Sequence, residues 1–192
     1  MKIILSVRST FGGGKTTAVR EFLNGYPAEE LRGRDGKIRG YRVDAEAAGI
    51  EQPIYVIGKY DNVCGGCDAI PTQQEAADRI LAAHPHGHVL FEGALVSASG
   101  VNGTVTQAIH PTGADCYAFL DTPLEVCIER VKGRRAAAGN LKELNPKNLI
   151  HKFDSVVSTY KTLRREGYDA RLIDHTRVHE QLCAIIREYE AK

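Results

Sequence analysis

Short apolar runs alternate along the chain with longer segments of helical periodicity. Apolar runs bounded by turn residues are typical of buried strands, and apolar spacing of three or four residues is typical of helices. We expect strands at Lys2–Ser9, Tyr41–Val43, Pro53–Ile57, His88–Phe91, Cys116–Leu120 and Ala170–Ile173. We expect helices from the glycine-rich loop to Leu23, from Thr72 to Ala83, from Pro123 towards Arg135, from Lys147 to Arg165 and from Val178 to Tyr189. This alternation predicts a three-layer α/β fold, with a central parallel sheet covered by helices on both faces.

Turn residues mark several of the helix ends. Thr72 and Glu75 form a capping-box pattern, in which the threonine hydroxyl and the glutamate each satisfy an amide of the first helical turn. Asn145 followed by Pro146 predicts a cap with proline at the first helical position. Gly167 predicts the end of the same helix.

The composition is that of an ordinary globular protein. The chain has 192 residues, of which 43% are hydrophobic, and its 25 basic residues are balanced by 24 acidic ones. We expect a single domain over residues 1–192, and this composition excludes disordered, collagen-like and coiled-coil chains. No apolar run approaches the roughly 20 residues needed to cross a bilayer, so we expect a cytoplasmic protein without membrane contact. Five cysteines are too few for a disulfide scaffold and predict mostly reduced thiols.

Positive charge is concentrated in two segments. Residues 32–42 carry five basic side chains against Asp35 alone, within a polar, glycine-rich stretch that we expect to be a surface excursion. Residues 130–142 carry five basic side chains and no acid. Such segments either bind a polyanion or are solvated surface, and an adjacent active site favours the first. We therefore expect a substrate-binding insertion with a small hairpin at 26–52 and an arginine-rich lid at 130–146.

One motif decides the class of chemistry. Ser9–Thr16 matches the phosphate-loop pattern of glycine, four residues and Gly-Lys-Ser/Thr, except that serine stands at the first position. A strand precedes the motif and a helix follows it, which distinguishes it from a chance glycine-rich turn. We expect the backbone amides to cradle the phosphates of ATP, the lysine to bind the β- and γ-phosphates and the threonine hydroxyl to bind Mg²⁺. The expected nucleotide-binding residues are Phe11, Gly12, Gly13, Gly14, Lys15, Thr16 and Thr17.

Carboxylates follow two of the expected strands. Glu92 ends a buried strand, and at the carboxyl end of a parallel strand we expect it to hold Mg²⁺ or its waters. Phosphoryl transfer to a hydroxyl also needs a base, and Asp61 or Asp68, after the strand Pro53–Ile57, is the expected one. Asp44 is a weaker choice. For each aspartate a turn-forming role remains open.

Arginines gather at the end of a predicted helix. We expect Arg130, Arg134 and Arg135 to close over the triphosphate, stabilise charge in the transition state and exclude water. The alternative is that they stabilise the C-terminus of the helix. Asp174 and His175 follow the last strand, where the loop of such folds borders the nucleotide base, so we expect both residues near the adenine.

The spacing of Cys64 and Cys67 is compatible with a redox or zinc motif. A second cysteine pair or a histidine pair at metal spacing is missing, and the next predicted helix begins only at Thr72. We therefore favour a loop constraint or plain thiols over redox or metal chemistry.

The chain resembles P-loop kinases of the nucleoside and nucleotide kinase type over nearly its whole length. The resemblance rests on the phosphate loop, the strand that ends at Glu92, the Asp121–Pro123 turn and the arginine-rich segment at 130–135. It implies the P-loop kinase fold and the transfer of phosphate from ATP to a hydroxyl group.

A narrower resemblance rests on four short strings, which are Gly58–Asp61, Cys64–Asp68, Leu120–Pro123 and Asn145–Asn148. There the chain is similar to phage-encoded kinases that phosphorylate 5-hydroxymethyluracil in DNA, a step in thymidine hypermodification. A polymeric substrate implies contacts to DNA phosphates, for which we expect Arg34 and Arg39. The acceptor base has to be flipped out of its stack, or the strand opened, and we expect Tyr41 and Tyr60 to stack on it. Buried packing is the alternative for both tyrosines.

Two other functions remain open on the sequence alone. One is a small-molecule kinase that acts on a free nucleoside or nucleotide. The other is a nucleotide switch or ATPase, which transfers phosphate to water or not at all. The arginine-rich lid argues against the second alternative, because a lid that excludes water favours transfer to an acceptor.

Overall fold

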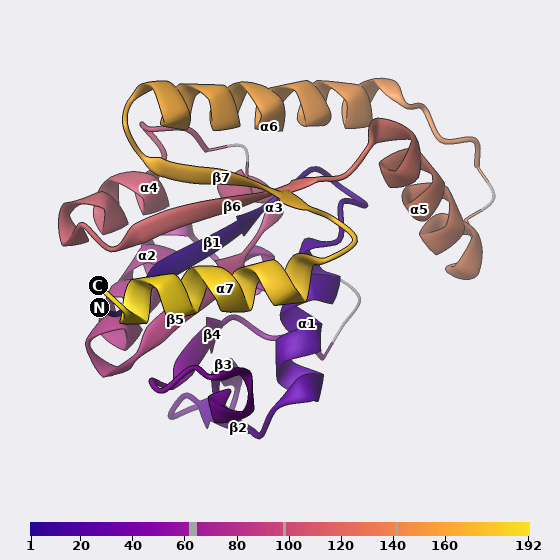
Figure 1. Cartoon of the computed structure of the whole chain (residues 1–192). Coiled ribbons are helices and arrows are strands. Elements are labelled where there is room, and N and C mark those ends of the chain that lie inside the picture. Colours follow the sequence, from indigo (N-terminus) through magenta and orange to yellow (C-terminus); the bar gives the residue numbers. More distant parts are fainter. Residues whose placement is uncertain (62–64, 98, 141) are drawn as a thin grey trace.

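The computed structural model describes residues 1–61, 65–97, 99–140 and 142–192 (Figure 1). In these residues seven strands form one sheet with the order β2-β3-β4-β5-β1-β6-β7. The strands are β1 (Ile4–Arg8), β2 (Ala28–Arg32), β3 (Ile38–Val43), β4 (Ile54–Ile57), β5 (His88–Glu92), β6 (Asp115–Asp121) and β7 (Asp169–Asp174). The five strands from β4 to β7 in this order run parallel, so their carboxyl ends meet at one edge, where ligands bind in open α/β sheets.

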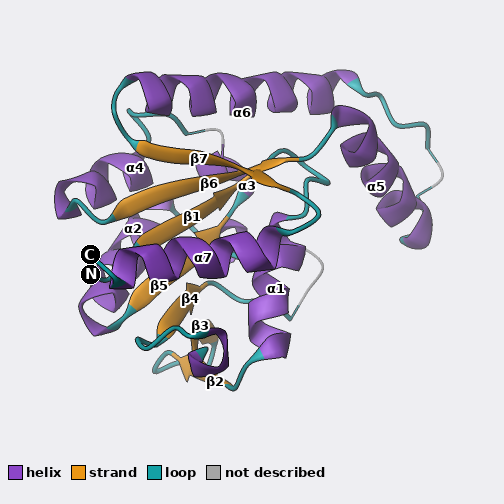
Figure 2. Cartoon of the chain, in the orientation of Figure 1, coloured by secondary structure: helices purple, strands orange, loops and turns teal. Residues whose placement is uncertain are grey.

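Helices cover both faces of the sheet, which confirms the predicted three-layer α/β fold (Figure 2). The helices are α1 (Lys15–Gly25), α2 (Gln73–Ala83), α3 (Ala94–Ser97), α4 (Thr104–Ile109), α5 (Leu124–Ala137), α6 (Lys147–Arg165) and α7 (Val178–Glu190). The side chains of α1 and α7 pack on one face, and those of α2, α4 and α6 pack on the other. Helix α5 stands off the end of the sheet and packs against α6 through Cys127, Val131 and Leu149 (Figure 1).

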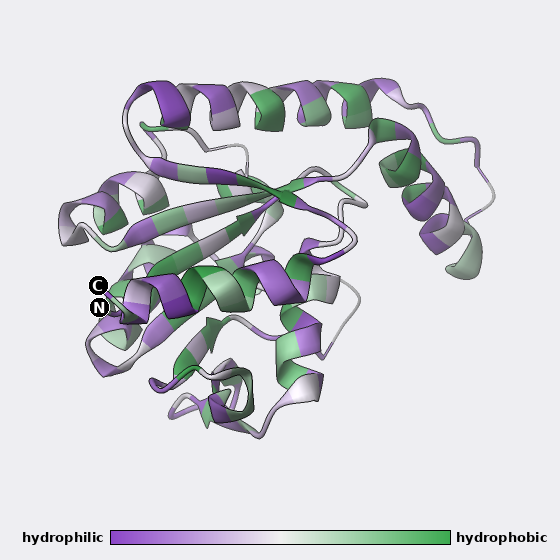
Figure 3. Cartoon of the chain, viewed as in Figure 1, coloured by the Kyte–Doolittle hydropathy of each residue, from purple (hydrophilic) through white to green (hydrophobic). Residues whose placement is uncertain are grey.

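Two apolar clusters fix the central strand from both sides, because side chains alternate between the faces of a sheet. Leu5 and Val7 of β1 join Phe22 of α1 in one cluster, whereas Ile4 joins Ile80 of α2 in the other. All five side chains are fully buried, and burial of a side chain of this size stabilises the fold by about 2 kcal/mol. Figure 3 shows hydrophobic positions along the central strands and alternating bands on α6 and α7. The loop that follows β1 therefore starts from a rigid strand.

The inserted hairpin extends the sheet beyond β4. Strands β2 and β3 pair antiparallel, and β3 pairs antiparallel with β4, so the sheet is mixed rather than parallel throughout. The prediction of an irregular surface excursion is wrong in one respect. Ala28–Arg32 forms an edge strand, and the next strand begins at Ile38 rather than Tyr41. An edge strand buries few side chains, so its polar sequence lacks the apolar pattern of an inner strand.

The ends of the longer helices lie close to the predicted ones, with two differences in the caps. Thr72 is the N-cap of α2, and its Oγ1 accepts a hydrogen bond from the Glu75 amide at 3.1 Å. The Glu75 carboxylate is turned to the Arg79 guanidinium, so the second half of the capping box is replaced by an ion pair. Pro146 is the N-cap of α6 and not its first residue, while the Asn145 side chain accepts from the first amide of the helix at 3.0 Å.

Two short helices between β5 and β6 were not predicted. Helices α3 and α4 have four and six residues, which is too short for a helical periodicity to be visible in the sequence. Of the helices in the described ranges, none is both long and apolar enough to cross a membrane.

Candidate active site

The phosphate loop leaves β1 at the carboxyl edge of the sheet and enters α1 at Lys15. Gly12 and Gly14 have φ angles of +77° and +100°, in the left-handed region that glycine adopts without strain. Gly14 is the N-cap of α1, and no side chain of the described residues caps the amides of the first turn. These amides point out of the positive end of the helix dipole, which makes them suited to bind a phosphate.

The serine at the first position of the loop is explained by its packing. Ser9 is buried, and its Oγ lies 1.8 Å from the place where a Cβ on Gly13 would lie. The serine side chain therefore fills the inside of the loop, and residue 13 has to be glycine. A Cβ on Gly12 would in turn lie 2.5 Å from the carbonyl oxygen of Cys127, so the loop is also packed closely against α5.

Lys15 and Glu92 face each other beside the loop. The Lys15 Nζ donates to the carbonyls of Ser9 and Thr10 at 3.1 and 3.2 Å, and the Thr16 hydroxyl donates to Glu92 Oε1 at 2.9 Å. Burial raises the pKa of Glu92 to about 7, although the Lys15 ammonium and the Thr16 hydrogen bond oppose this shift. Burial also lowers the pKa of Lys15, against the attraction of Glu92. The fold thus brings the lysine and hydroxyl of the phosphate loop together with a carboxylate from a distant part of the sequence.

Thr16 and Glu92 fit a magnesium ion that arrives with a nucleotide. In the described part of the chain there is no cluster of three or more histidine, cysteine or acidic side chains able to hold a metal ion. Mg²⁺ is commonly bound through one or two protein oxygens, with phosphate oxygens and waters as its other ligands. A hydroxyl and a carboxylate at hydrogen-bond distance provide these oxygens, and the ion would neutralise charge on the β- and γ-phosphates.

Asp68 lies beside Glu92 and holds the chain that follows β5. It belongs to the short 3-10 turn Cys67–Ala69, and its two carboxylate oxygens accept hydrogen bonds from the Ala94 amide at 2.8 and 2.9 Å. Asp68 and Glu92 both line the cavity of 890 Å³ that contains the phosphate loop, which we call the main cavity. Of the expected aspartates in the described residues, Asp68 is therefore the one that shares a cavity with the phosphate loop.

The other expected carboxylates lie elsewhere. Asp61 pairs with Lys59 at 3.1 Å and lines a second cavity on the other side of the segment that carries Asp68. Asp44 accepts a hydrogen bond from the Glu46 amide at 3.2 Å, which is a turn-forming role. The sequence left Asp61 and Asp68 equivalent, because their positions relative to the phosphate loop depend on the path of the chain after β4.

Of the cysteine pair, Cys64 lies outside the described residues. Cys67 is buried and is a free thiol, and burial raises its pKa well above the ordinary value. A neutral buried thiol is a poor nucleophile and a poor metal ligand. Its surroundings therefore agree with the plain-thiol interpretation for this member of the pair.

Helix α6 contributes a cation that the sequence did not reveal. The Lys152 Nζ donates to the Ala94 carbonyl at 2.8 Å and lies 5.9 Å from the centroid of the Phe11 ring. It is close enough to Lys15 for the two ammonium groups to repel each other, and burial lowers the pKa of Lys152 while Asp68 opposes the shift. Ala94 is thus held at its amide by Asp68 and at its carbonyl by Lys152. A lysine within an amphipathic helix has no sequence signal that separates it from solvent-facing lysines.

Two of the three lid arginines lie over the phosphate loop. Arg130 and Arg134 of α5 line the main cavity, and Arg130 Nη1 lies 3.4 Å from the Gly12 carbonyl. Arg135 turns away from the main cavity, because its guanidinium donates to the Lys142 carbonyl at 3.2 Å. Its visible role is to hold the loop after α5.

The main cavity continues from the phosphate loop to the start of α7. His175 lines this end, and its Nδ1 lies 2.8 Å from the Asp121 carbonyl oxygen. Asp174 is not among the residues that line the cavity, and it accepts hydrogen bonds from the amide and the hydroxyl of Thr176 at 2.8 and 2.7 Å. Asp174 therefore shapes the turn that carries His175. A volume of this size is ample for a nucleotide.

The expected substrate residues lie on or next to the hairpin, outside the main cavity. Arg34 is exposed in the β2–β3 turn, and Arg39 pairs with Asp35 at 2.8 Å. The Tyr60 ring is buried 6.2 Å from the ring of Tyr41, whose Oη accepts from the Tyr60 amide at 3.3 Å. The two tyrosines thus pack against each other, which is the alternative to stacking on a base.

The fold and the site together are those of a P-loop kinase, with a phosphate loop, an acidic residue at the neighbouring strand end and arginines above them. No family model matches the chain. It is 34% identical over 167 residues to a 5-hmdU DNA kinase of Pseudomonas phage PaMx11, which covers 85% of this chain and 86% of that protein. The chain therefore belongs to the family of the 5-hmdU DNA kinases and is a phosphotransferase.

Two further relatives match over shorter stretches. The chain is 36% identical over 89 residues to a 5-hmdU DNA kinase of Pseudomonas phage M6, covering 42% of this chain and 46% of that protein. It is 31% identical over 108 residues to the 5-hmdU DNA kinase 1 of Salmonella phage ViI, covering 54% of this chain and 47% of that protein. Both relatives are 5-hmdU DNA kinases, as is the relative with the longer match.

Proposed function

We propose that this enzyme transfers the γ-phosphate of ATP to the hydroxymethyl group of 5-hydroxymethyluracil in DNA, in the cytoplasm of a phage-infected cell. The names of the three relatives support the acceptor. The observation that carries the proposal is the convergence of Lys15, Glu92 and Asp68 on one cavity with the phosphate loop.

The nucleotide side of the site has a role for each group. The loop amides and Lys15 bind the triphosphate, and the lysine exchanges the Ser9 and Thr10 carbonyls for phosphate oxygens. Thr16 and Glu92 hold the Mg²⁺ that arrives with ATP. The guanidinium groups of α5 that line the cavity stabilise charge on the transferring phosphoryl group.

The acceptor side is served by Asp68 and Lys152. The hydroxymethyl oxygen bonds to the γ-phosphorus while the bond to the bridging oxygen of ADP breaks, and the hydroxyl proton passes to the Asp68 carboxylate. Lys152 adds positive charge next to Ala94, where the phosphoryl group and the acceptor meet. The acceptor base has to leave the stack to reach this place, as with other enzymes that act on a base in DNA.

A transfer assay with γ-labelled ATP tests the function. Three acceptors are compared, which are an oligonucleotide with one 5-hydroxymethyluracil, the same oligonucleotide with thymine, and the free 5-hydroxymethyldeoxyuridine nucleoside. We expect label on the modified oligonucleotide alone, and none with the Lys15→Ala variant, because the phosphates lose their ammonium partner. Label on the free nucleoside alone would identify a small-molecule kinase. ATP hydrolysis at the same rate with and without every acceptor would identify an ATPase.

A further inference from the structure

A second cavity lies on the outer side of the wall that carries Asp68. It has a volume of 490 Å³ and is formed by the β2–β3 hairpin, the segment after β4 and helix α2. It is lined by Arg32, Gly36, Lys37, Ile38, Arg39, Lys59, Asp61, Ala69, Ile70 and Arg79. Five of these side chains are basic and one is acidic. Glu30, Asp35 and Glu75 also pair with the basic side chains from outside the lining, so five cations face four acids and leave an excess of one positive charge.

The two cavities share a wall. Asp68 lines the main cavity and Ala69, the next residue, lines the second one, and consecutive Cα atoms are only about 3.8 Å apart. Lys59 of the second cavity is likewise bridged to Gly66, next to Gly65 of the main cavity. The second cavity therefore adjoins the place beside Asp68, within reach of a polymer bound there.

Ion pairs hold the cations of the second cavity without blocking them. Lys59 pairs with Asp61 at 3.1 Å, and Arg39 and Lys37 share Asp35 at 2.8 and 3.8 Å. These side chains are 38% to 78% exposed, and ion pairs at such exposure contribute only about 0–1 kcal/mol. A phosphate can therefore replace the carboxylate partner at small cost.

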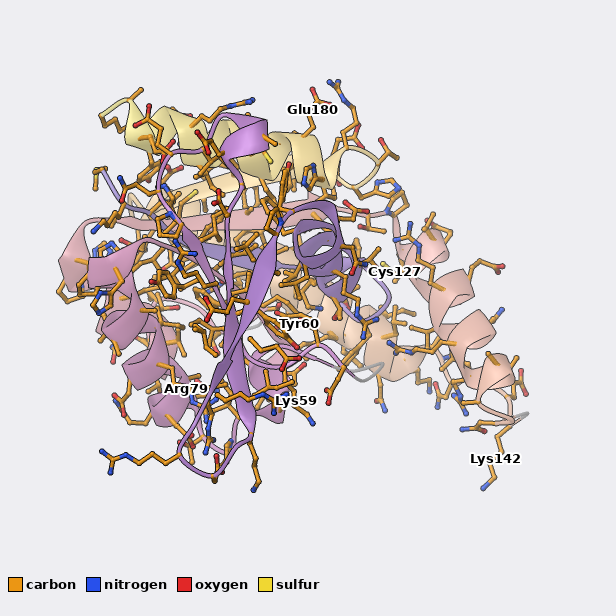
Figure 4. The ribbon with its side chains drawn as sticks, turned by 90° about the horizontal axis from the view of Figure 1, so that it is seen from below. Lys59, Tyr60, Arg79, Cys127, Lys142 and Glu180 are labelled. Carbon is orange, nitrogen blue, oxygen red and sulfur yellow. The ribbon has the colours of Figure 1, made fainter. Side chains whose placement is uncertain are left out.

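Arg79 of α2 is the least exposed cation of the second cavity. Its side chain is 19% exposed and is fixed by Glu75 of the same helix. Figure 4 labels Arg79 and Lys59 on either side of the hairpin strands, whereas Lys142 of the lid loop lies at the far tip of the molecule. The basic side chains of the second cavity therefore come from the hairpin, the segment after β4 and α2. The described part of the lid contributes none of the lining residues. Fixed guanidinium groups of this kind bind phosphate with two parallel hydrogen bonds.

We propose that the second cavity binds a backbone phosphate of the acceptor DNA strand, next to the nucleotide whose base enters the main cavity. This inference rests on the proposed function and extends it to a specific contact. The triphosphate of ATP already has its own cradle, and a free nucleoside has no phosphate to place there. A phosphate bound in the second cavity would fix the position of the DNA strand, so that the base of the neighbouring nucleotide lies beside the Asp68 carboxylate.

The test combines a scan of DNA phosphates with a matched pair of variants. Single phosphates within three nucleotides of one 5-hydroxymethyluracil are replaced in turn by uncharged methylphosphonate, and kcat/KM is measured for each oligonucleotide. The cavity variant is Lys37→Ala with Lys59→Ala. The control variant is Lys147→Ala with Lys161→Ala, two exposed lysines of α6. Binding is measured in parallel by fluorescence anisotropy across a range of salt concentrations.

In the wild-type enzyme we expect one or two of the replacements to lower kcat/KM about tenfold, because a charge-assisted hydrogen bond is lost. In the cavity variant the same replacements change kcat/KM less than twofold, while the control variant behaves as wild type. The slope of log Kd against log salt falls by about 0.7 for each phosphate contact removed from a single strand.

Equal effects of the replacements in the wild type and the cavity variant, or an unchanged salt slope, would overturn the inference. So would phosphorylation of the nucleoside monophosphate as efficiently as DNA, because no flanking phosphate would then be needed. A wild-type enzyme that binds DNA but does not phosphorylate it would contradict the proposed function instead, and the salt slopes would still test the cavity.

Discussion

Asp68 and Asp61 are the same residue type in one short segment, yet they have different surroundings. Asp68 holds the Ala94 amide in the main cavity beside Glu92. Asp61 pairs with Lys59 in the second cavity. A general base has to lie within hydrogen-bond reach of the hydroxyl that it activates, so position and not residue type separates the two candidates.

The first prediction distinguishes these aspartates by turnover. We expect Asp68→Asn to lower kcat for the modified oligonucleotide about 100-fold or more, because the amide cannot take the proton, with the KM for ATP within twofold of wild type. Asp61→Asn should leave kcat within twofold. Steady-state kinetics of both variants provide the measurement, and the opposite ranking would assign the base to Asp61.

The second prediction concerns Lys152, whose ammonium faces Ala94 from α6. Lys152→Met keeps the length of the side chain and removes its charge, so we expect kcat to fall at least about tenfold without a change in melting temperature. Lys152→Arg should recover part of the loss. Lys161→Met, on the same helix and exposed, is the control. Wild-type turnover in Lys152→Met would remove this residue from the site.

Between elements, a buried histidine ties β5 to the two ends of the chain. His88 Nδ1 accepts a hydrogen bond from the Ile3 amide at 3.1 Å, so its Nε2 carries the proton and donates to Glu190 Oε1 at 2.9 Å. Glu190 also accepts from the amides of Glu51 and Gln52. This network holds four segments together at the amino edge of the sheet, opposite the active site.

The third prediction is a dependence of stability on pH. Burial lowers the pKa of His88 below its ordinary value of 6.5, so between the two values the unfolded chain binds more protons. The His88 contribution to stability is therefore fully present above about pH 6.5 and is lost as the pH drops below it, by at most about 1.4 kcal/mol per unit. Glu92, whose pKa is raised to about 7, contributes in the opposite direction over the same range, so the His88 contribution is read from a comparison of variants. Melting temperatures from pH 7.5 to 5 measure this slope. Compared with wild type, His88→Gln should lose the His88 part of the fall in stability at low pH and the exposed His86→Gln should keep it. An equal slope in all three proteins would exclude a contribution of His88.

The fourth prediction separates the arginines of α5. Arg134 lines the main cavity, whereas Arg135 holds the loop after the helix. We expect Arg134→Ala to lower kcat at least about tenfold and Arg135→Ala to change it less than threefold. Equal losses in the two variants would mean that α5 moves as a unit over the nucleotide.

For the molecule as a whole, the features that could be predicted from the sequence are those that a short local pattern of residues encodes. The phosphate loop, the strand ending at Glu92 and the hairpin insertion are continuous stretches whose residue types carry their own signal. Strand β2 was not predicted, because most of its side chains are exposed and its sequence lacks the apolar pattern of a buried strand. Lys152, the difference between the two aspartates and the second cavity arise only when distant segments meet, so no local pattern contains them.

The path of the acceptor is the central claim, and one structure tests it most directly. It is the structure of the enzyme with a non-hydrolysable ATP analogue, Mg²⁺ and an oligonucleotide that contains 5-hydroxymethyluracil. We expect the triphosphate in the phosphate loop and the hydroxymethyl oxygen within hydrogen-bond distance of an Asp68 carboxylate oxygen, in line with the γ-phosphate. A phosphate loop without the triphosphate, or an acceptor base seated away from Asp68, would contradict it.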